Sequence, residues 1–373
     1  MHPLQHKIGI LTFHCANSYG AVWQAYALQQ YLTSLGGCAE IIDYRAKRII
    51  DTYKIFRSMR PRDLLKGLVK LYQHEVAHNQ AFDAFRQKKL LLSPYSGASW
   101  PLPLDYQAVV VGSDQVWNPH IIGNDPAYFL EGTPGLRKIA YAASIGQNKL
   151  TQAQLQALAQ KISSFDAVSL REYDKVNYNF EQYGLKDIEE VLDPTFLLSK
   201  QQWNQHLQLE QPTQRPYILL FKMTYNEKLN QLADQMAKKN HCEIKTIVAY
   251  NHPLKDRDLQ VIRACSPEKF LSLIYNAQGV ITDSFHGLAF SIIFEKNFFV
   301  TFHATRGIRL LTLLKKAGLT KRCFESQFPI TNLLEPIDFT AVRKNLSSHI
   351  VHSKEYLKNS LRGLLTEENS HVQ

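Results

Sequence analysis

The chain has 373 residues, 45% of them hydrophobic and 20% charged, which is the composition of a soluble globular protein and excludes a disordered or fibrous one. This length exceeds what one hydrophobic core usually serves, so we expect two domains. The formal net charge of +10 favours an anionic partner, but no zinc-finger or RNA-binding motif supports nucleic acid.

Three features bear on the compartment. Only a few apolar residues precede His14, and no small-residue cleavage site follows, so we expect no signal peptide. No segment reaches the roughly 18 consecutive apolar residues that a membrane-spanning helix needs. Five cysteines without a Cys-x-x-Cys pair predict neither a disulfide framework nor a zinc site. We therefore expect a cytoplasmic protein.

The first fifty residues have the pattern of a strand, a helix and a second strand. Residues 7–13 are rich in β-formers, residues 17–21 predict a turn, and residues 22–36 have helical spacing. A second strand is expected from residue 38. This is half of a doubly wound sheet, and such sheets bind ligands at the loop that follows the first strand.

A basic helical insertion is expected over residues 45–92. Between residues 45 and 70, Lys and Arg alternate with apolar residues and only two Asp oppose them. This is the composition of helices that lie on an anionic membrane. The alternative is a pair of solvated helices that pack one face on the core.

Strands and helices alternate again from residue 108. Strands are expected at 108–111, 137–144, 167–172 and in a stretch that ends at Asp193. The polar residues 199–216 are the best candidate for a crossing between domains. A second alternating set follows, so we predict two Rossmann-like domains facing a cleft, at 1–205 and 206–373.

The turn with the most polar residues lies in the stretch GVITDSFHGLAF, residues 279–290, between a predicted buried strand and a predicted buried helix. We expect the helix to begin at about Gly287, and a helix N-terminus at a sheet edge binds phosphate or carboxylate. Ser284 or Asp283 can cap the helix, and Gly287 allows close approach. His286 lies in the same turn and is the candidate general acid or base. The alternative is that Asp283 and Ser284 only cap the helix and that His286 is a core histidine.

Two arginines follow the next predicted strand. Arg306 and Arg309 are expected at the same sheet edge as the histidine turn. Arginine clamps carboxylate or phosphate through two parallel N–H bonds. Two such turns on consecutive strand ends are better evidence for an anion site than either turn alone.

Three loops of the first half are expected across the cleft, after residues 13, 111 and 170. Their short polar side chains and exposed aromatic rings suit the hydroxyl groups of a sugar. The alternative for each loop is ordinary turn chemistry. The candidate acceptor-binding residues are Asn17, Tyr19, Gly20, Ser113 and Trp117, of which Tyr19 and Trp117 supply the exposed rings.

Common cofactor motifs do not occur. The sequence has no Gly-x-Gly-x-x-Gly after the first strand and no phosphate-binding Gly-x-x-x-x-Gly-Lys-Ser/Thr. It has no His/Cys cluster with metal-ligand spacing. We therefore expect no metal and no cofactor.

Taken together, six ordered stretches between residues 7 and 320 resemble the polysaccharide pyruvyl transferase family. The most specific of them is the turn T-D-S-F-H-G, Thr282–Gly287. The resemblance implies two Rossmann-like domains, as in type B glycosyltransferases. It also implies transfer of the enolpyruvyl unit of phosphoenolpyruvate onto two hydroxyls of one sugar, which yields a cyclic ketal and phosphate.

The resemblance also suggests residue roles. Some relatives carry Arg at the position of Ser284, so the anion is left to Arg309, Arg306 and Arg171. We expect His286 to protonate the methylene carbon, and Asp114, or alternatively His14, to accept the hydroxyl proton.

The implied acceptor is a sugar of a capsular or exopolysaccharide precursor. If that precursor is linked to a lipid diphosphate, residues 45–70 would face the inner side of the membrane. One alternative is a nucleotide-sugar-dependent glycosyltransferase of the same fold. Another is a saccharide-binding protein without activity.

Overall fold

The computed structural model describes residues 6–52, 68–102, 105–210, 215–249, 261–302, 307–324 and 335–365. Most of the basic segment 45–70 lies outside these ranges, so its membrane contact stays a prediction. In the described part of the chain, no helix combines the length and the apolar composition that a membrane crossing needs.

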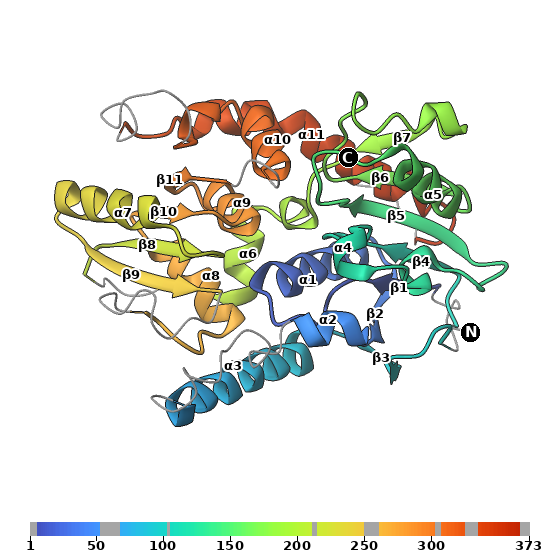
Figure 1. Ribbon diagram of the computed structural model, residues 1–373, viewed down its shortest axis with the longest axis horizontal. Helices are drawn as coiled ribbons and strands as arrows, with labels where there is room; N and C mark the ends of the chain where they lie inside the picture. Colours follow the sequence, from blue (N-terminus) through green and yellow to red (C-terminus); the bar gives the residue numbers. More distant parts are fainter. Residues whose placement is uncertain are drawn as a thin grey trace, which may run out of the picture.

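The first half of the chain forms a seven-stranded parallel sheet in the order β3-β2-β1-β4-β5-β6-β7 (Figure 1). Its central strands are buried runs such as Ala-Val-Val-Val, as expected of strands that are covered on both faces. The strands are β1 (Lys7–Leu11), β2 (Cys38–Tyr44), β3 (Leu92–Gly97), β4 (Ala108–Val111), β5 (Arg137–Ala143), β6 (Ala167–Leu170) and β7 (Ile188–Glu190). The helices are α1 (Tyr19–Ser34), α2 (Lys47–Thr52), α3 (Leu68–Lys89), α4 (Pro119–Ile122), α5 (Gln152–Ile162) and α6 (Lys200–Leu207), with short 3-10 turns η3 (Pro126–Phe129), η4 (Glu181–Tyr183) and η5 (Pro194–Leu197).

The second half forms a four-stranded parallel sheet in the order β11-β10-β8-β9. Its strands are β8 (Tyr217–Lys222), β9 (Glu243–Val248), β10 (Gly279–Thr282) and β11 (Asn297–Val300). Its helices are α7 (Glu227–Asn240), α8 (Pro267–Asn276), α9 (Phe285–Ile293), α10 (Ile308–Ala317) and α11 (Phe339–Ser360), with the turn η6 (Thr320–Arg322).

Both sheets are doubly wound, which confirms the predicted fold class. In the first, the chain runs outward from β1 to β3 and then returns to place β4 on the other side of β1. In the second, β10 returns to the free side of β8 in the same way. Ligands of open parallel sheets bind at the carboxyl ends of the strands beside such a switch point.

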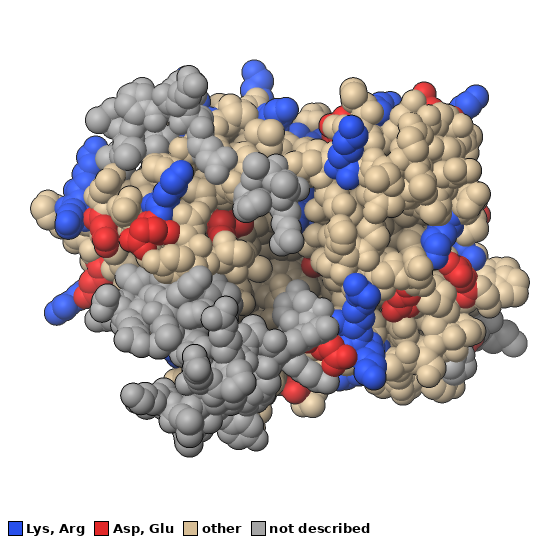
Figure 2. Space-filling model, in the orientation of Figure 1, with Lys and Arg blue, Asp and Glu red and all other residues tan. Residues whose placement is uncertain are grey.

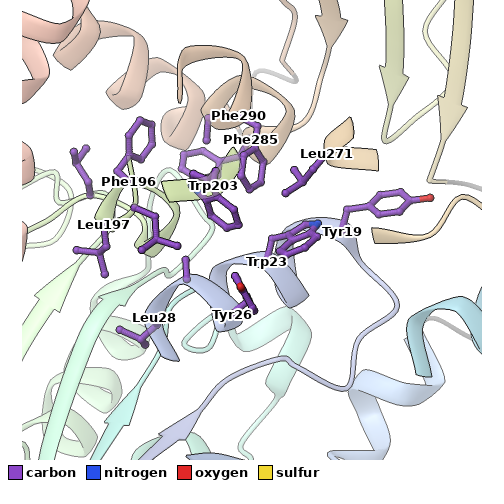
Figure 3. Packing of buried hydrophobic residues seen from close by; sticks show 14 of the residues in the cluster. Tyr19, Trp23, Tyr26, Leu28, Phe196, Leu197, Trp203, Leu271, Phe285 and Phe290 are labelled. Atoms are coloured by element: carbon purple, nitrogen blue, oxygen red, sulfur yellow. The ribbon is translucent and has the colours of Figure 1, made fainter. Parts of the chain in front are cut away.

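A shared apolar core joins the two sheets. Trp203 of α6 lies between Trp23 of α1 and Phe290 of α9, with ring centroids 5.6 Å and 5.2 Å away (Figure 3). The indole N–H of Trp23 also donates to the carbonyl of Pro267 in α8. These buried contacts hold α1 of the first half against α8 and α9 of the second.

The C-terminal helix α11 returns to the first sheet, which the sequence reading did not predict. Figure 1 shows it running from the half that holds the four-stranded sheet toward β5–β7. The Tyr356 hydroxyl donates to the carbonyl of Ala140 in β5, and Ser353 accepts from the N–H of Leu192. The predicted boundary after residue 205 is not tested by this arrangement and stays a prediction.

Two helices that border the loops begin earlier than expected. α1 begins at Tyr19, with Ser18 at its N-cap, so Tyr19 and Gly20 belong to the first helical turn and not to a loop. α9 begins at Phe285, which places His286 in its first turn. Both helix N-termini lie at the carboxyl edges of the sheets.

Candidate functional site

The switch points of the two sheets face each other. β4 and β6 of the first sheet and β10 of the second bring Asp114, Arg171 and His286 into one connected cluster. Figure 2 shows a hollow near the centre of one face, between the halves that hold the two sheets. Charged side chains therefore converge where the fold predicts a ligand site.

The turn after β10 is built as the sequence predicted. Ser284 is the N-cap of α9, and its hydroxyl accepts from the N–H of Gly287 at 3.3 Å. Asp283 instead accepts from the backbone of Met223 and from Thr224, which fixes the loop after β8. A Cβ on Gly287 would lie 2.6 Å from Oγ1 of Thr282, so glycine is needed here for the helix to approach the strand.

His286 bridges the two halves of the protein. Its side chain is buried, and its Nε2 lies 3.5 Å from Oδ2 of Asp193, which precedes η5 in the first half. On the other side, its Nδ1 faces Gly20 of α1 so closely that a Cβ there would overlap the ring. The imidazole is thus held between two elements of the opposite domain.

Asp193 is the centre of the cluster. Its Oδ2 accepts from the Arg171 guanidinium at 2.7 Å and from the Ser113 hydroxyl at 3.2 Å, while its Oδ1 caps η5 through Thr195. Burial disfavours its charge, yet His286 and Arg171 hold the pKa of Asp193 well below its ordinary value. Asp193 is therefore a buried carboxylate that stays ionised.

Arg171 is enclosed by acidic groups. Besides Asp193, it lies 3.5 Å from Asp114 and 3.6 Å from Glu172, and its guanidinium carbon lies 4.4 Å from the ring centre of Phe285. Each nitrogen of the guanidinium thus faces a carboxylate. This arginine balances the carboxylates of the site and has little capacity left for a ligand anion.

Glu172 is a second buried carboxyl group. It accepts from the Ser144 hydroxyl, and the N–H of Gly146 lies 3.4 Å from Oε1. Burial raises its pKa above the ordinary value, although Arg171 and Arg309 act in the opposite direction. Arg309 of α10 is therefore near enough to Glu172 to act on its charge, and its contact with a ligand stays a prediction. Arg306 lies outside the described residues.

His14, the alternative base, has both ring nitrogens engaged. Nε2 lies 2.8 Å from Oδ1 of Asp43, and Nδ1 lies 3.3 Å from the carbonyl oxygen of Thr12. Both neighbours are acceptors, and which ring nitrogen donates depends on the tautomer. Asp114 is less buried than Asp193, and it contacts the cluster through Arg171.

The expectation of exposed aromatic rings was wrong. Trp117 is 1% exposed and packs on Phe129 in the core of the first domain. Its indole N–H can be buried there because it donates to the carbonyl of Tyr128. Tyr19 is 5% exposed, stacks on Phe270 of α8, and donates to a carbonyl of the second half. Both rings stabilise the protein interior.

The remaining acceptor candidates differ in their surroundings. The Asn17 side chain is bound by Asn79 and Arg86 of α3. Ser113 lies in the cluster through Asp193, and Gly20 contacts the histidine ring. Contact of these residues with a sugar stays a prediction.

Sequence reasoning missed Asp193 and Glu172 as site residues. Both follow strands of the predicted first sheet, Glu172 two residues after β6 and Asp193 three residues after β7. A polar residue at the carboxyl end of a parallel strand is the signal that identifies them. Their pairing with residues from other strands depends on the strand order, which the pattern alone does not give.

A family model described as polysaccharide pyruvyl transferase matches residues 19–301. A search of curated proteins gave no match.

Similar solved structures include a UDP-GlcNAc 2-epimerase from Neisseria meningitidis, at 11% identity and a TM-score of 0.47 over 95% of this chain and 99% of that chain. A glycosyltransferase from Rickettsia africae has 12% sequence identity and a TM-score of 0.46, over 96% of this chain and 100% of that chain. The heptosyltransferase WaaC from E. coli has 13% sequence identity and a TM-score of 0.38, over 92% of this chain and 99% of that chain. Likeness at this level bears on neither substrate nor reaction.

Proposed function

Because this chain belongs to the polysaccharide pyruvyl transferase family, we propose that it transfers the enolpyruvyl group of phosphoenolpyruvate onto two hydroxyls of one sugar. The observation that carries the proposal is the pairing of His286 with Asp193 beside the N-terminus of α9. It combines a proton donor with an anion-binding helix end. Phosphoenolpyruvate needs both.

The proposed reaction balances without a cofactor. His286 gives a proton to the methylene carbon of phosphoenolpyruvate, which becomes a methyl group and leaves a cationic C2. One sugar hydroxyl attacks C2 and loses its proton to Asp114. The C2–O bond to phosphate then breaks, and the second hydroxyl attacks C2. The second hydroxyl passes its proton to the released phosphate, and the proton on Asp114 returns to His286 through solvent, so both groups are restored and every proton is accounted for.

Different groups are proposed to hold the two charges of the donor. The first N–H groups of α9 have no partner within the helix, and they carry the positive end of its dipole. Arg309 adds a full positive charge from the neighbouring α10, near the buried Glu172. We assign the anion to these groups because Arg171 is already surrounded by three carboxylates.

The acceptor follows from the family. We propose a sugar of a capsular or exopolysaccharide precursor, which enters from the side of Ser113 and Asp114. If that precursor is linked to a lipid diphosphate, the basic segment 45–70 is the surface that contacts the membrane. Removal of those charges would then lower both liposome binding and activity on a lipid-linked acceptor.

Thermal unfolding tests the donor assignment. A ligand that binds only the native state raises the melting temperature, so phosphoenolpyruvate is expected to raise it, and UDP- or GDP-sugars are not. Stabilisation by a nucleotide sugar alone would instead favour a glycosyltransferase of the same fold. The His286→Ala variant provides the control for activity: undiminished pyruvylation by it would make the histidine structural.

A further inference from the structure

We infer that Asp193 is the positioning residue for the acid His286: it holds the imidazole through Nε2 and fixes the proton of the neutral ring on that nitrogen. This inference rests on the proposed function in calling the histidine an acid. The pairing itself is a property of the free protein. It can therefore be tested without any substrate.

The geometry of the pair indicates which ring nitrogen of His286 carries the proton. Nε2 lies 3.5 Å from Oδ2 of Asp193, within ion-pair distance but longer than a tight hydrogen bond. Catalytic hydrogen bonds in free enzymes are often long and shorten when substrate binds. An ionised carboxylate only accepts, so the nitrogen that faces it carries the proton. In the neutral ring, Nε2 is therefore protonated and Nδ1 is not.

The carboxylate is fixed independently of the histidine. Arg171 and Ser113 hold Oδ2, and the N–H and hydroxyl of Thr195 hold Oδ1 at 3.0 Å and 2.8 Å. A carboxylate with this many donors cannot turn to follow the ring. It thus fixes the ring, as an orienting carboxylate does in other acid–base pairs.

In the described contacts, Asp193 is the charged group that faces the ring. It lies at ion-pair distance from Nε2, whereas Arg171 faces Asp193, Asp114 and Glu172. α1 contributes the uncharged Gly20 on the other side. On the histidine's own turn, Asp283 is bound to the loop after β8. Asp193 is therefore the group placed to orient the ring.

Two carboxylates of the cluster make a matched pair for the test. Asp193 and Glu172 are both buried, and both lie against Arg171, but the described contacts link only Asp193 to His286. Asp193→Asn keeps an oxygen that can accept from Thr195, and it removes the charge. Glu172→Gln removes the same charge elsewhere in the cluster.

The experiment determines the tautomer of the neutral ring by NMR of the ring nitrogens in the substrate-free protein labelled with nitrogen-15. The His286 signal is identified by its loss in His286→Ala. In Asp193→Asn, we expect the ring to lose its preference for a proton on Nε2 and to show a mixture of the two tautomers. In Glu172→Gln, we expect the proton to stay on Nε2. The same mixture in both variants, or an unchanged ring in Asp193→Asn, would overturn the inference.

A second measurement needs no variant of Asp193. In the unmodified protein at high pH, the nitrogen shifts of His286 should show a neutral ring protonated at Nε2. A ring protonated at Nδ1 overturns the inference even if Asp193→Asn does not fold. Failure of phosphoenolpyruvate to bind or react would count against the proposed function only, since neither NMR measurement involves it.

Discussion

The absence of a side chain at Gly20 makes room for the imidazole of His286. The glycine lies in the first turn of α1 and the histidine in the first turn of α9, and a Cβ on Gly20 would overlap Nδ1, Cγ and Cε1 of the ring. The backbone of Gly20 is helical, so the reason for glycine at this position is the neighbouring ring and not the local conformation. α1, which follows a strand of the first sheet, and α9, which follows a strand of the second, thus contact each other at the site through Gly20 and His286.

This contact predicts that Gly20→Ala displaces the histidine. Alanine is the better helix former, so any loss of function comes from displacement of the ring from its position beside Asp193. We expect kcat/KM to fall by about 100-fold, as for misplacement of a catalytic group by about 1 Å. Gly97→Ala is the control, because its Cβ would lie 3.5 Å from Leu102, an ordinary contact. Equal activity of both variants would contradict the prediction.

Arg171→Met is predicted to destabilise the fold strongly. The substitution leaves Asp193 and Glu172 buried without their cation, and breaking a buried ion pair in this way costs about 3–5 kcal/mol. Urea unfolding measures the loss. Arg215→Met, which removes an exposed pair with Glu243, is expected to change the unfolding midpoint little. If the two variants unfold at similar urea concentrations, Arg171 does not balance the cluster.

Asp193→Asn should become less harmful to stability as the pH falls. The pKa of Asp193 is lower in the folded protein than in the unfolded chain, so the native state binds fewer protons. Its contribution is complete above the unfolded value of about 3.9 and is lost as the pH drops below it. Urea unfolding should therefore give Asp193→Asn a lower free energy of unfolding than the unmodified protein at neutral pH, and this difference should narrow below about pH 4. A difference in the free energy of unfolding that does not change with pH would contradict the prediction.

Glu172→Gln should behave in the opposite way. Burial raises the pKa of Glu172 in the folded protein, so the ionised group costs stability above that pKa. The variant is expected to be more stable than the unmodified protein at high pH. This advantage should shrink as the pH falls toward the unfolded value of about 4.3. A variant that is less stable at every pH would show that the interactions of Glu172 with Arg171 and Arg309 outweigh its burial.

Two substitutions separate the anion-binding groups. Arg309→Gln removes the positive charge that we propose binds phosphoenolpyruvate. It should abolish most of the rise in melting temperature that this ligand causes. Ser284→Ala removes only the cap of α9, at a cost of about 1 kcal/mol in stability. We expect it to lower the melting temperature without ligand and to keep most of the rise. The reverse ranking would assign the anion to the turn and not to the arginine.

The sequence predicts the alternating strands and helices and the turn at Ser284–Gly287, because buried parallel strands and helix caps have local patterns. The role of Asp193 has no such pattern. Its partners Arg171 and His286 lie 22 and 93 residues away along the chain, and only the strand order brings them together. The burial of Trp117 was missed for a similar reason, since its partner Phe129 belongs to a later turn.

The proposed function makes a direct prediction about the product. Glycans from cells with and without the gene can be compared by mass spectrometry. We expect a sugar that carries a pyruvate-sized increment in cells with the gene and lacks it in cells without the gene. The gene should restore the increment, and its His286→Ala form should not. Identical glycans with and without the gene would contradict the assignment of pyruvyl transfer to this protein.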